Sequence, residues 1–321
     1  MNHKPRFTVV LAAIDDYATI EQVHLCLEAQ TIRSDLEIQF ICRSLAHLSL
    51  PAGFVERHPD IVILEGGEQL LLNEARELGI HAATTPYVLI LEDHCLPYPE
   101  CLEKMLDRLL EGWSAVGPGF VSGNQASSLG IAANLLTYGE WMGHKEGGKR
   151  TFIAGFNSAF PTQILRERDK RLAEDMVTPS TLQQSLVSLG HEFYFEPEAV
   201  MAHWESSTYY GIRQILVKNG FGMGLLRARN WPIWQKSLWT LVTPLLMGYR
   251  FLRASNTWRR VDGCPFRSLL HLAPLSVLWT LGELQGYWSK NRQAAIEGSS
   301  EVERNRQRFV DSEREPIRKP Y

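Results

Sequence analysis

The stretch Tyr87-Val88-Leu89-Ile90-Leu91-Glu92-Asp93-His94 indicates most directly how the chain folds. Its first five residues form an apolar run, which is typical of a strand buried in a parallel sheet. The run ends abruptly in two acids and a histidine. In open α/β sheets, ligands collect at the carboxyl ends of such strands. We therefore interpret this end as a functional site, although a solvated loop capped by Asp93 is the simpler alternative.

The segments around this stretch alternate between strands and helices. Phe7–Ala13, Leu36–Ile41 and Ile61–Leu64 are predicted strands, while Leu70–Ala83 and Pro99–Leu110 are predicted helices. The alternation predicts an α/β fold with a doubly wound, mainly parallel sheet and right-handed crossovers. Further along, we expect strands at Ala115–Phe120, Phe152–Phe160, Phe193–Phe195 and Ala199–Ala202, helices at Leu129–Trp141, Leu182–Leu189 and Tyr209–Arg229, and a mobile loop at Gly143–Gly148.

Composition limits the classes of function. The 321 residues are 45% hydrophobic and 21% charged, which is enough to build a sizeable core. A net charge of −3 gives no reason to expect a nucleic-acid partner. The five cysteines have no zinc-binding spacing, and no signal peptide is recognisable at the start. These features predict a reduced protein that faces the cytosol.

Four segments, taken in order, resemble the family 2 glycosyltransferases, which have the GT-A nucleotide-sugar fold. They are the strand Thr8–Ala13, the pair Ala75-Arg76 before Gly79, the strand end Leu91–His94 followed by Pro97 and Pro99, and Gly155–Phe160. The last two stand where the family has its D-x-D and G-x-N-x-A motifs. The resemblance covers the first two-thirds of the chain. It implies inverting transfer of a sugar from a nucleoside diphosphate sugar, which we expect to be a UDP-sugar, to a glycan or lipid-linked acceptor.

The resemblance also implies roles for individual residues. The metal and diphosphate site would contain Glu92, Asp93, His94 and His203, and the donor site Ala12, Asp15, Arg76, Asp93 and Asn157. A divalent cation would stabilise the charge on the leaving diphosphate. Carboxylates suit Mn²⁺ or Mg²⁺, and the imidazole favours Mn²⁺. On an extended strand Glu92 and His94 face the same way. His94 alone is nearly as well explained as a surface or supporting histidine.

The catalytic base is predicted at Glu174-Asp175. The family places an acidic pair ahead of the helix that corresponds to Leu182–Leu189, but Thr178-Pro179 stands there instead. Glu174-Asp175 lies shortly upstream, and a solvated acidic pair beside Arg171 is an equal alternative. The family's opening P-x-x-N is replaced by Ala12–Asp15, and Cys42-Arg43 replaces its nucleobase-binding acid. The missing nucleobase-binding acid and the displaced base motivate a second hypothesis, a catalytically silent GT-A module that binds a glycan or a partner transferase.

The C-terminal third has a different character. Two uncharged runs, Ser237–Tyr249 and Ser268–Gly282, are separated by a segment that is rich in arginine. Both are shorter than the ~20 apolar residues of a spanning helix. We therefore expect in-plane or re-entrant helices, joined by a basic loop, at the cytoplasmic face of the inner membrane. A buried helical subdomain or a dimer interface is the alternative. The predicted domains are a GT-A domain at 1–230, a helical hairpin at 231–290 and a polar tail at 291–321.

Overall fold

The computed structural model describes residues 4–14, 16–291 and 297–298. The chain forms two compact units. Unit 1 contains residues up to 121 together with 144–202, and unit 2 contains 122–143 together with the chain from 203 onward. The domain boundaries that we placed at residues 230 and 290 stay predictions. Most of the predicted tail, 291–321, lies outside the described residues.

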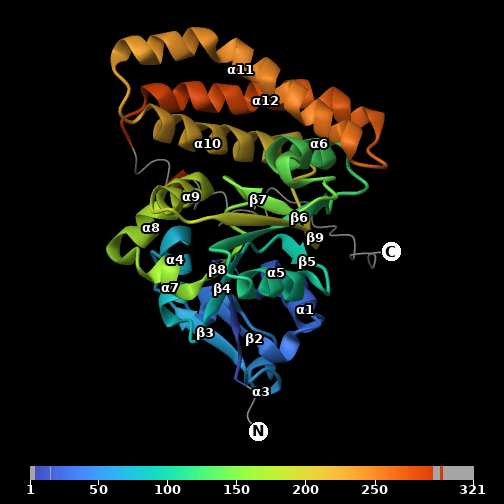
Figure 1. The fold of residues 1–321 in the computed structure, drawn as a ribbon, viewed down its shortest axis with the longest axis vertical. Helices are drawn as coiled ribbons and strands as arrows, with labels where there is room; N and C mark the ends of the chain where they lie inside the picture. Colours follow the sequence, from blue (N-terminus) through green and yellow to red (C-terminus); the bar gives the residue numbers. More distant parts are fainter. Residues whose placement is uncertain (1–3, 15, 292–296, 299–321) are drawn as a thin grey trace. The chain divides into compact units, whose positions relative to one another are not determined.

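Unit 1 is built on one mixed sheet, shown in Figure 1. Its parallel half consists of β1 (Phe7–Ala12), β2 (Leu36–Cys42), β3 (Ile61–Glu65) and β4 (Tyr87–Leu91), in the order β3-β2-β1-β4. The sheet continues through β8 (Ala159–Pro161), β6 (Ala115–Ser122), β9 (Phe193–His203) and β5 (Cys95–Pro97), and β7 (Gly148–Arg150) pairs with β9. β8 is antiparallel to β4 and β6. The predicted mainly parallel α/β sheet is confirmed.

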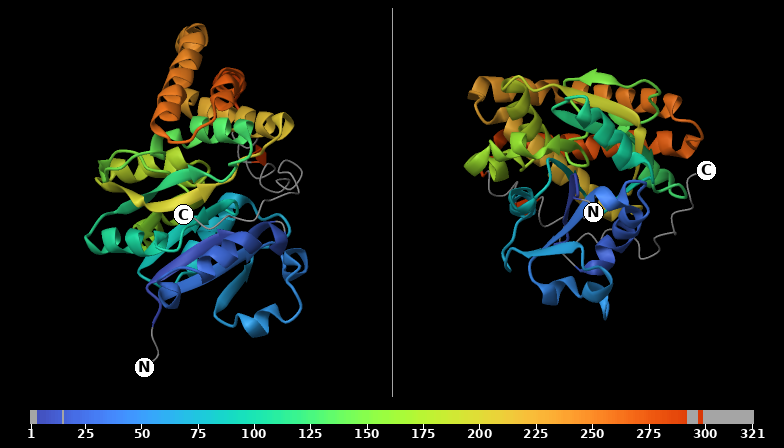
Figure 2. Two further views of the ribbon diagram at one scale, coloured as in Figure 1. Left: turned by 90° about the vertical axis from the view of Figure 1, so that its right-hand side faces the viewer. Right: turned by 60° about the horizontal axis from the view of Figure 1, so that its bottom comes forward.

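The helices of unit 1 flank this sheet (Figure 2). They are α1 (Tyr17–Glu28), α2 (Leu45–Leu48), α3 (Phe54–Arg57), α4 (Leu72–Ala82), α5 (Cys101–Leu110), α7 (Thr162–Arg166), α8 (Leu172–Asp175) and α9 (Pro179–Ser188), with 3-10 turns η1 (Arg33–Asp35) and η3 (Asp169–Arg171). α4 packs on β1 and β2. A Cβ at Gly79 would lie 2.6 Å from Val10 Cγ1. Glycine at this position therefore allows α4 to lie directly against β1.

Three segments differ from the predicted elements. Of the strand expected over 152–160, only its end forms β8, because Gly155 and Asn157 have φ values of 52° and 71°. Such left-handed residues interrupt an extended chain. The two short strands expected around Pro197 form one strand, β9. β6 approaches it closely, since a Cβ at Gly119 would lie 2.8 Å from the carbonyl oxygen of Pro197. The predicted loop over 143–148 ends in β7.

Unit 2 is helical and contains α6 (Ser128–Thr137), η2 (Gly139–Trp141), α10 (Tyr209–Ala228), α11 (Ile233–Arg260) and α12 (Phe266–Trp288). α12 packs against α10, α11 and α6. Glycines spaced four residues apart on α10 (Gly220, Gly224) and α12 (Gly282, Gly286) bring these two helices together. A Cβ at any of them would lie 2.1 to 2.3 Å from a carbonyl oxygen of the opposite helix. The α10–α12 contact is therefore made backbone against backbone.

The expected basic loop between the two C-terminal helices is wrong. Its arginines are Arg250, Arg253, Arg259, Arg260 and Arg267, and α11 includes all of them except Arg267, which lies in α12. Arg250 binds the buried Glu283 of α12, and Arg260 donates hydrogen bonds to carbonyl oxygens near η2. These partners favour a continuous helix over an exposed loop. None of the helices within the described ranges is both long and apolar enough to cross a membrane.

Candidate active site

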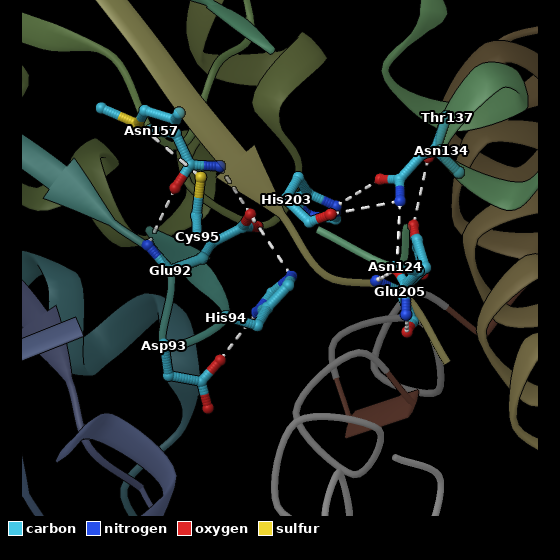
Figure 3. Close-up of polar contacts among 11 residues, drawn as sticks. Glu92, Asp93, His94, Cys95, Asn124, Asn134, Thr137, Asn157, His203 and Glu205 are labelled. Carbon is cyan, nitrogen blue, oxygen red and sulfur yellow. Dashed lines mark hydrogen bonds and ion pairs between the residues drawn. The ribbon is translucent and has the colours of Figure 1, made fainter. Parts of the chain in front are cut away.

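The acid–histidine cluster lies where β4 gives way to β5. β4 ends at Leu91, and the chain turns at Asp93 and His94. His94 is buried, and the two acids are half-buried. Its Nδ1 lies 2.7 Å from Asp93 Oδ1, and its Nε2 lies 3.7 Å from Glu92 Oε2 (Figure 3). The turn, rather than an extended strand, therefore lets one imidazole contact both carboxylates.

Asn157 positions Glu92 from the neighbouring segment. Its φ of 71° is left-handed, a conformation that asparagine tolerates better than most residues. The side-chain Oδ1 accepts a hydrogen bond from the Glu92 backbone N–H at 2.9 Å, and Nδ2 donates to Glu92 Oε2 at 2.6 Å (Figure 3). The backbone N–H of Asn157 also donates to Ile90 at 2.7 Å. The buried amide thus holds the Glu92 carboxylate at the end of β4.

The donor atoms of this cluster suit a divalent cation. Glu92 offers a carboxylate oxygen, and His94 offers an imidazole nitrogen, a combination that Mn²⁺ accepts. Metal-binding histidines usually donate their other ring N–H to a carboxylate or carbonyl. The Nδ1 of His94 has such a partner in Asp93, so Nε2 is the nitrogen that remains to bind a metal. The residues present therefore fit the predicted cation.

The predicted donor-binding residues fall at three places in unit 1. Arg76 is buried on α4, and its guanidinium lies 3.6 Å from the centre of the Phe156 ring, a cation–π contact. Ala12 ends β1, and Asp15 lies outside the described residues. A role of these residues in donor binding stays a prediction. Asn157 makes the bonds to Glu92 described above, and Asp93, the fifth predicted donor contact, lies in the turn after β4.

The predicted catalytic base lies on α8, which is tied to α4. Asn73 Nδ2 donates to the Ala173 carbonyl at 3.0 Å, and Glu77 Oε1 accepts from the Ala173 N–H at 3.3 Å. The sequence did not reveal this supporting role of Glu77. Asp175 Oδ2 accepts a hydrogen bond from Arg168 Nε at 2.8 Å. Of the two predicted bases, Glu174 is exposed and Asp175 is half-buried.

His203 is the last residue of β9 and the first of the second segment of unit 2. Its Nδ1 lies 2.8 Å from Asn134 Oδ1 (Figure 3). Its ring packs against that of Tyr138, with the centroids 3.9 Å apart and the planes tilted by 34°. An amide oxygen only accepts hydrogen bonds, so Nδ1 of His203 is the donor in this bond. No motif in the sequence linked Asn134 to this histidine. Its role as a metal ligand stays a prediction.

Comparison with known proteins supports the resemblance seen in the sequence. Residues 39–169 match the model of Glycosyl transferase family 2. Among solved structures, the chain is similar to a mannosyltransferase from Pyrobaculum calidifontis in complex with GDP-Man and Mn²⁺. The two share 15% identity at a TM-score of 0.53, over 90% of this chain and 89% of that one. This likeness confirms the GT-A fold. A search of curated proteins finds no match.

Proposed function

Proceeding from the family 2 match and the GT-A fold, we propose that the protein is an inverting, metal-assisted glycosyltransferase that uses a nucleoside diphosphate sugar. The carrying observation is the arrangement at the end of β4. Glu92 and His94 Nε2 lie 3.7 Å apart, Asn157 holds the first residue and Asp93 holds the second. A pair of donor atoms fixed in this way at a strand end can receive a cation without much rearrangement.

In this proposal Glu92 and His94 bind the cation, and Asp93 orients His94. Mn²⁺ is the first expectation and Mg²⁺ the second, because one donor is an imidazole. The bound cation supplies positive charge to the leaving diphosphate. Direct metal binding by Asp93 and by His203 stays a prediction. So does the choice of a UDP-sugar as donor, because the GDP-Man complex describes the neighbouring protein alone.

The acceptor hydroxyl must lose a proton during an inverting displacement. Glu174 is the proposed base, because its side chain is exposed whereas Asp175 is half-buried. The links from α4 to Ala173 keep the α8 backbone next to Glu174 in place. Loss of turnover with retained nucleotide binding in Glu174→Gln would support this role. Unchanged turnover would remove Glu174 from the reaction.

Calorimetry tests the metal-assisted site. We expect UDP to bind with Mn²⁺ and to bind much more weakly after chelation. Glu92→Gln should abolish the effect of Mn²⁺, whereas Glu68→Gln, at an acid more than half exposed, should leave it unchanged. GDP is titrated in parallel to identify the nucleobase. Binding that ignores Mn²⁺, or that survives unaltered in Glu92→Gln, contradicts the proposal.

The second candidate function is a silent GT-A module that binds a glycan or a partner transferase. Two departures from the family motivate it, Cys42-Arg43 and Thr178-Pro179. Cys42 is buried, and Arg43 Nε donates to the Ile14 carbonyl at 3.0 Å. Hydrolysis of any nucleotide sugar, measured across a panel, decides between the two. Even slow hydrolysis that disappears in Glu92→Gln would argue against the silent module.

We also propose that unit 2 lies on the cytoplasmic face of the inner membrane and presents a lipid-linked acceptor. The support is a row of exposed large apolar side chains on α11, which are Ile233, Trp234, Leu238, Leu241, Leu245, Tyr249 and Leu252, each 50 to 79% exposed. Their helical spacing marks one face of the helix. The exposed Arg259, Arg260 and Arg267 nearby would favour anionic lipid.

Vesicle sedimentation tests this surface. The protein should bind anionic vesicles more strongly than neutral ones, and salt should weaken the difference. Leu241→Glu combined with Leu245→Glu should release it. Leu25→Glu, at an exposed leucine of α1 in unit 1, is the control and should not. Binding that is equal in both variants would contradict the proposal, and self-association lost in the double variant would indicate a second copy of the chain instead.

A further inference from the structure

A second group of metal-binding side chains lies in unit 1, on elements other than β4 and β5. His24 and Glu28 are four residues apart on α1, so they share one face of the helix. His58 directly follows α3. One ligand atom from each of the three residues lies within 4.8 Å of the other two. The group joins a helix to a segment about thirty residues further along the chain.

The distances suit a tetrahedral ion. His24 Nε2 and Glu28 Oε1 are 3.3 Å apart. Zn²⁺ binds nitrogen and carboxylate oxygen at about 2.0–2.1 Å, which places tetrahedral ligands roughly 3.3–3.4 Å from each other. The His24–Glu28 pair already has this separation. The half-buried His58 ring, 4.8 Å from the His24 ring between centroids, needs only a small side-chain movement to complete the set.

The hydrogen bonds around His24 also suit a ligand. Its Nδ1 lies 2.8 Å from the Tyr17 hydroxyl, so the ring can donate there while Nε2 faces Glu28. Burial lowers the pKa of His24 and favours the neutral imidazole that binds metals. Burial acts to raise the pKa of Glu28, but the hydrogen bond and charge of Arg33 lower it overall. A neutral His24 ring and an ionised Glu28 carboxylate are therefore available together.

Arg33 is the group that competes with an ion. Its Nη2 lies 2.9 Å from Glu28 Oε1, and the same nitrogen also binds Asp60. A cation that drew Glu28 away would leave Arg33 paired with Asp60. The two carboxylates outnumber this arginine, which leaves a net negative charge to attract a cation. A purely structural explanation is that His58 packs on Phe54, with the ring centroids 4.6 Å apart. This packing explains why His58 is partly buried, but it does not explain why a carboxylate lies beside His24.

We propose that His24, Glu28 and His58 form a second cation site, of the class that binds Zn²⁺ through two imidazoles and a carboxylate. Three protein ligands leave a fourth position for water. The ion would clamp α1 to the segment that links β2 with β3. This clamp would stabilise unit 1 and take no part in the proposed sugar transfer. The proposed β4 site offers one imidazole and one carboxylate, whereas this site offers two imidazoles and one carboxylate. The different ligand sets would distinguish Mn²⁺ at the first site from Zn²⁺ at the second.

Cobalt substitution tests the site. The full chain carrying Glu92→Gln, which removes one ligand of the β4 site, is stripped with EDTA and titrated with Co²⁺. We expect one Co²⁺ to give a visible absorption band typical of tetrahedral nitrogen and oxygen ligands. Zn²⁺ should displace it and raise the unfolding temperature. Glu28→Gln and His58→Phe should lose both effects, and the phenyl ring of the latter retains the contact with Phe54.

His47→Phe is the matched control, because His47 also faces a carboxylate, Glu68 at 3.3 Å, and lies just beyond β2. It should bind Co²⁺ like the parent. Far-ultraviolet circular dichroism establishes that each variant is folded. No Co²⁺ band in the parent, or an identical band in folded Glu28→Gln and His58→Phe, would overturn the proposal.

Discussion

Replacing Gly282 with alanine is expected to force α10 and α12 apart. The new Cβ would lie 2.1 Å from the carbonyl oxygen of Val217 and 3.0 Å from the backbone nitrogen of Phe221. Ordinary contact begins near 3.4 Å, so the first of these atoms is roughly 1.3 Å too close. Both are backbone atoms of a helix and cannot rotate away. The helices must therefore separate or bend.

The magnitude follows from two opposing effects. Alanine is favoured over glycine inside a helix by about 1 kcal/mol. Overpacking of a well-packed core costs about 1–3 kcal/mol, and occasionally more. Overlap with backbone puts Gly282→Ala at the upper end, so we expect a net loss of about 1–2 kcal/mol. Gly222 lies on α10, and a Cβ added there would have no other atom within 4 Å, so Gly222→Ala should gain the helix preference alone.

Urea denaturation of the full chain, followed by far-ultraviolet circular dichroism, measures both variants against the parent. The difference between Gly222→Ala and Gly282→Ala isolates the packing cost, because the gain in helix preference is common to both. We expect the transition of Gly282→Ala below that of the parent, and that of Gly222→Ala at or above it. Equal stabilisation by the two substitutions would refute the close α10–α12 contact.

Three further outcomes are expected. Glu283→Gln leaves the largely buried Arg250 without its anionic partner, so the free energy of unfolding should fall by about 3–5 kcal/mol. Thermal unfolding measures this loss, and an unchanged unfolding temperature would exclude the ion pair. Asn157→Ala removes both bonds to Glu92 and should weaken Mn²⁺-dependent nucleotide binding by about tenfold in calorimetry. Glycine tolerates the left-handed φ but makes no side-chain bonds. Asn157→Gly should therefore weaken nucleotide binding as much as Asn157→Ala if the loss of the bonds causes the effect. Burial and Glu283 raise the pKa of Tyr287 to about 12. Because the unfolded tyrosine loses its proton first, stability should fall between about pH 10 and pH 12. In Tyr287→Phe, the free energy of unfolding measured by denaturation should fall less steeply with pH over this range.

The parallel half of the sheet and the acid–histidine end of β4 were determined by the sequence itself. Apolar runs such as Tyr87–Leu91 need cover on both faces, and helices with apolar stripes between the strands provide it. The carboxyl end of such a strand is a predictable place for ligands. Local periodicity was therefore enough to predict the parallel strands. A short sequence motif was enough to identify Glu92, Asp93 and His94 as candidate site residues.

Tertiary structure alone decided what holds these groups. Asn157 binds Glu92 across sixty-five residues of chain, and only its left-handed backbone aims the amide there. Glu283 likewise pairs with Arg250, a residue that composition alone assigned to a basic loop. Periodicity shows which face of a helix or strand is buried, but it does not show which distant partner covers that face. The partner is selected by the packing of the whole unit, where close backbone contacts and paired charges must be satisfied together.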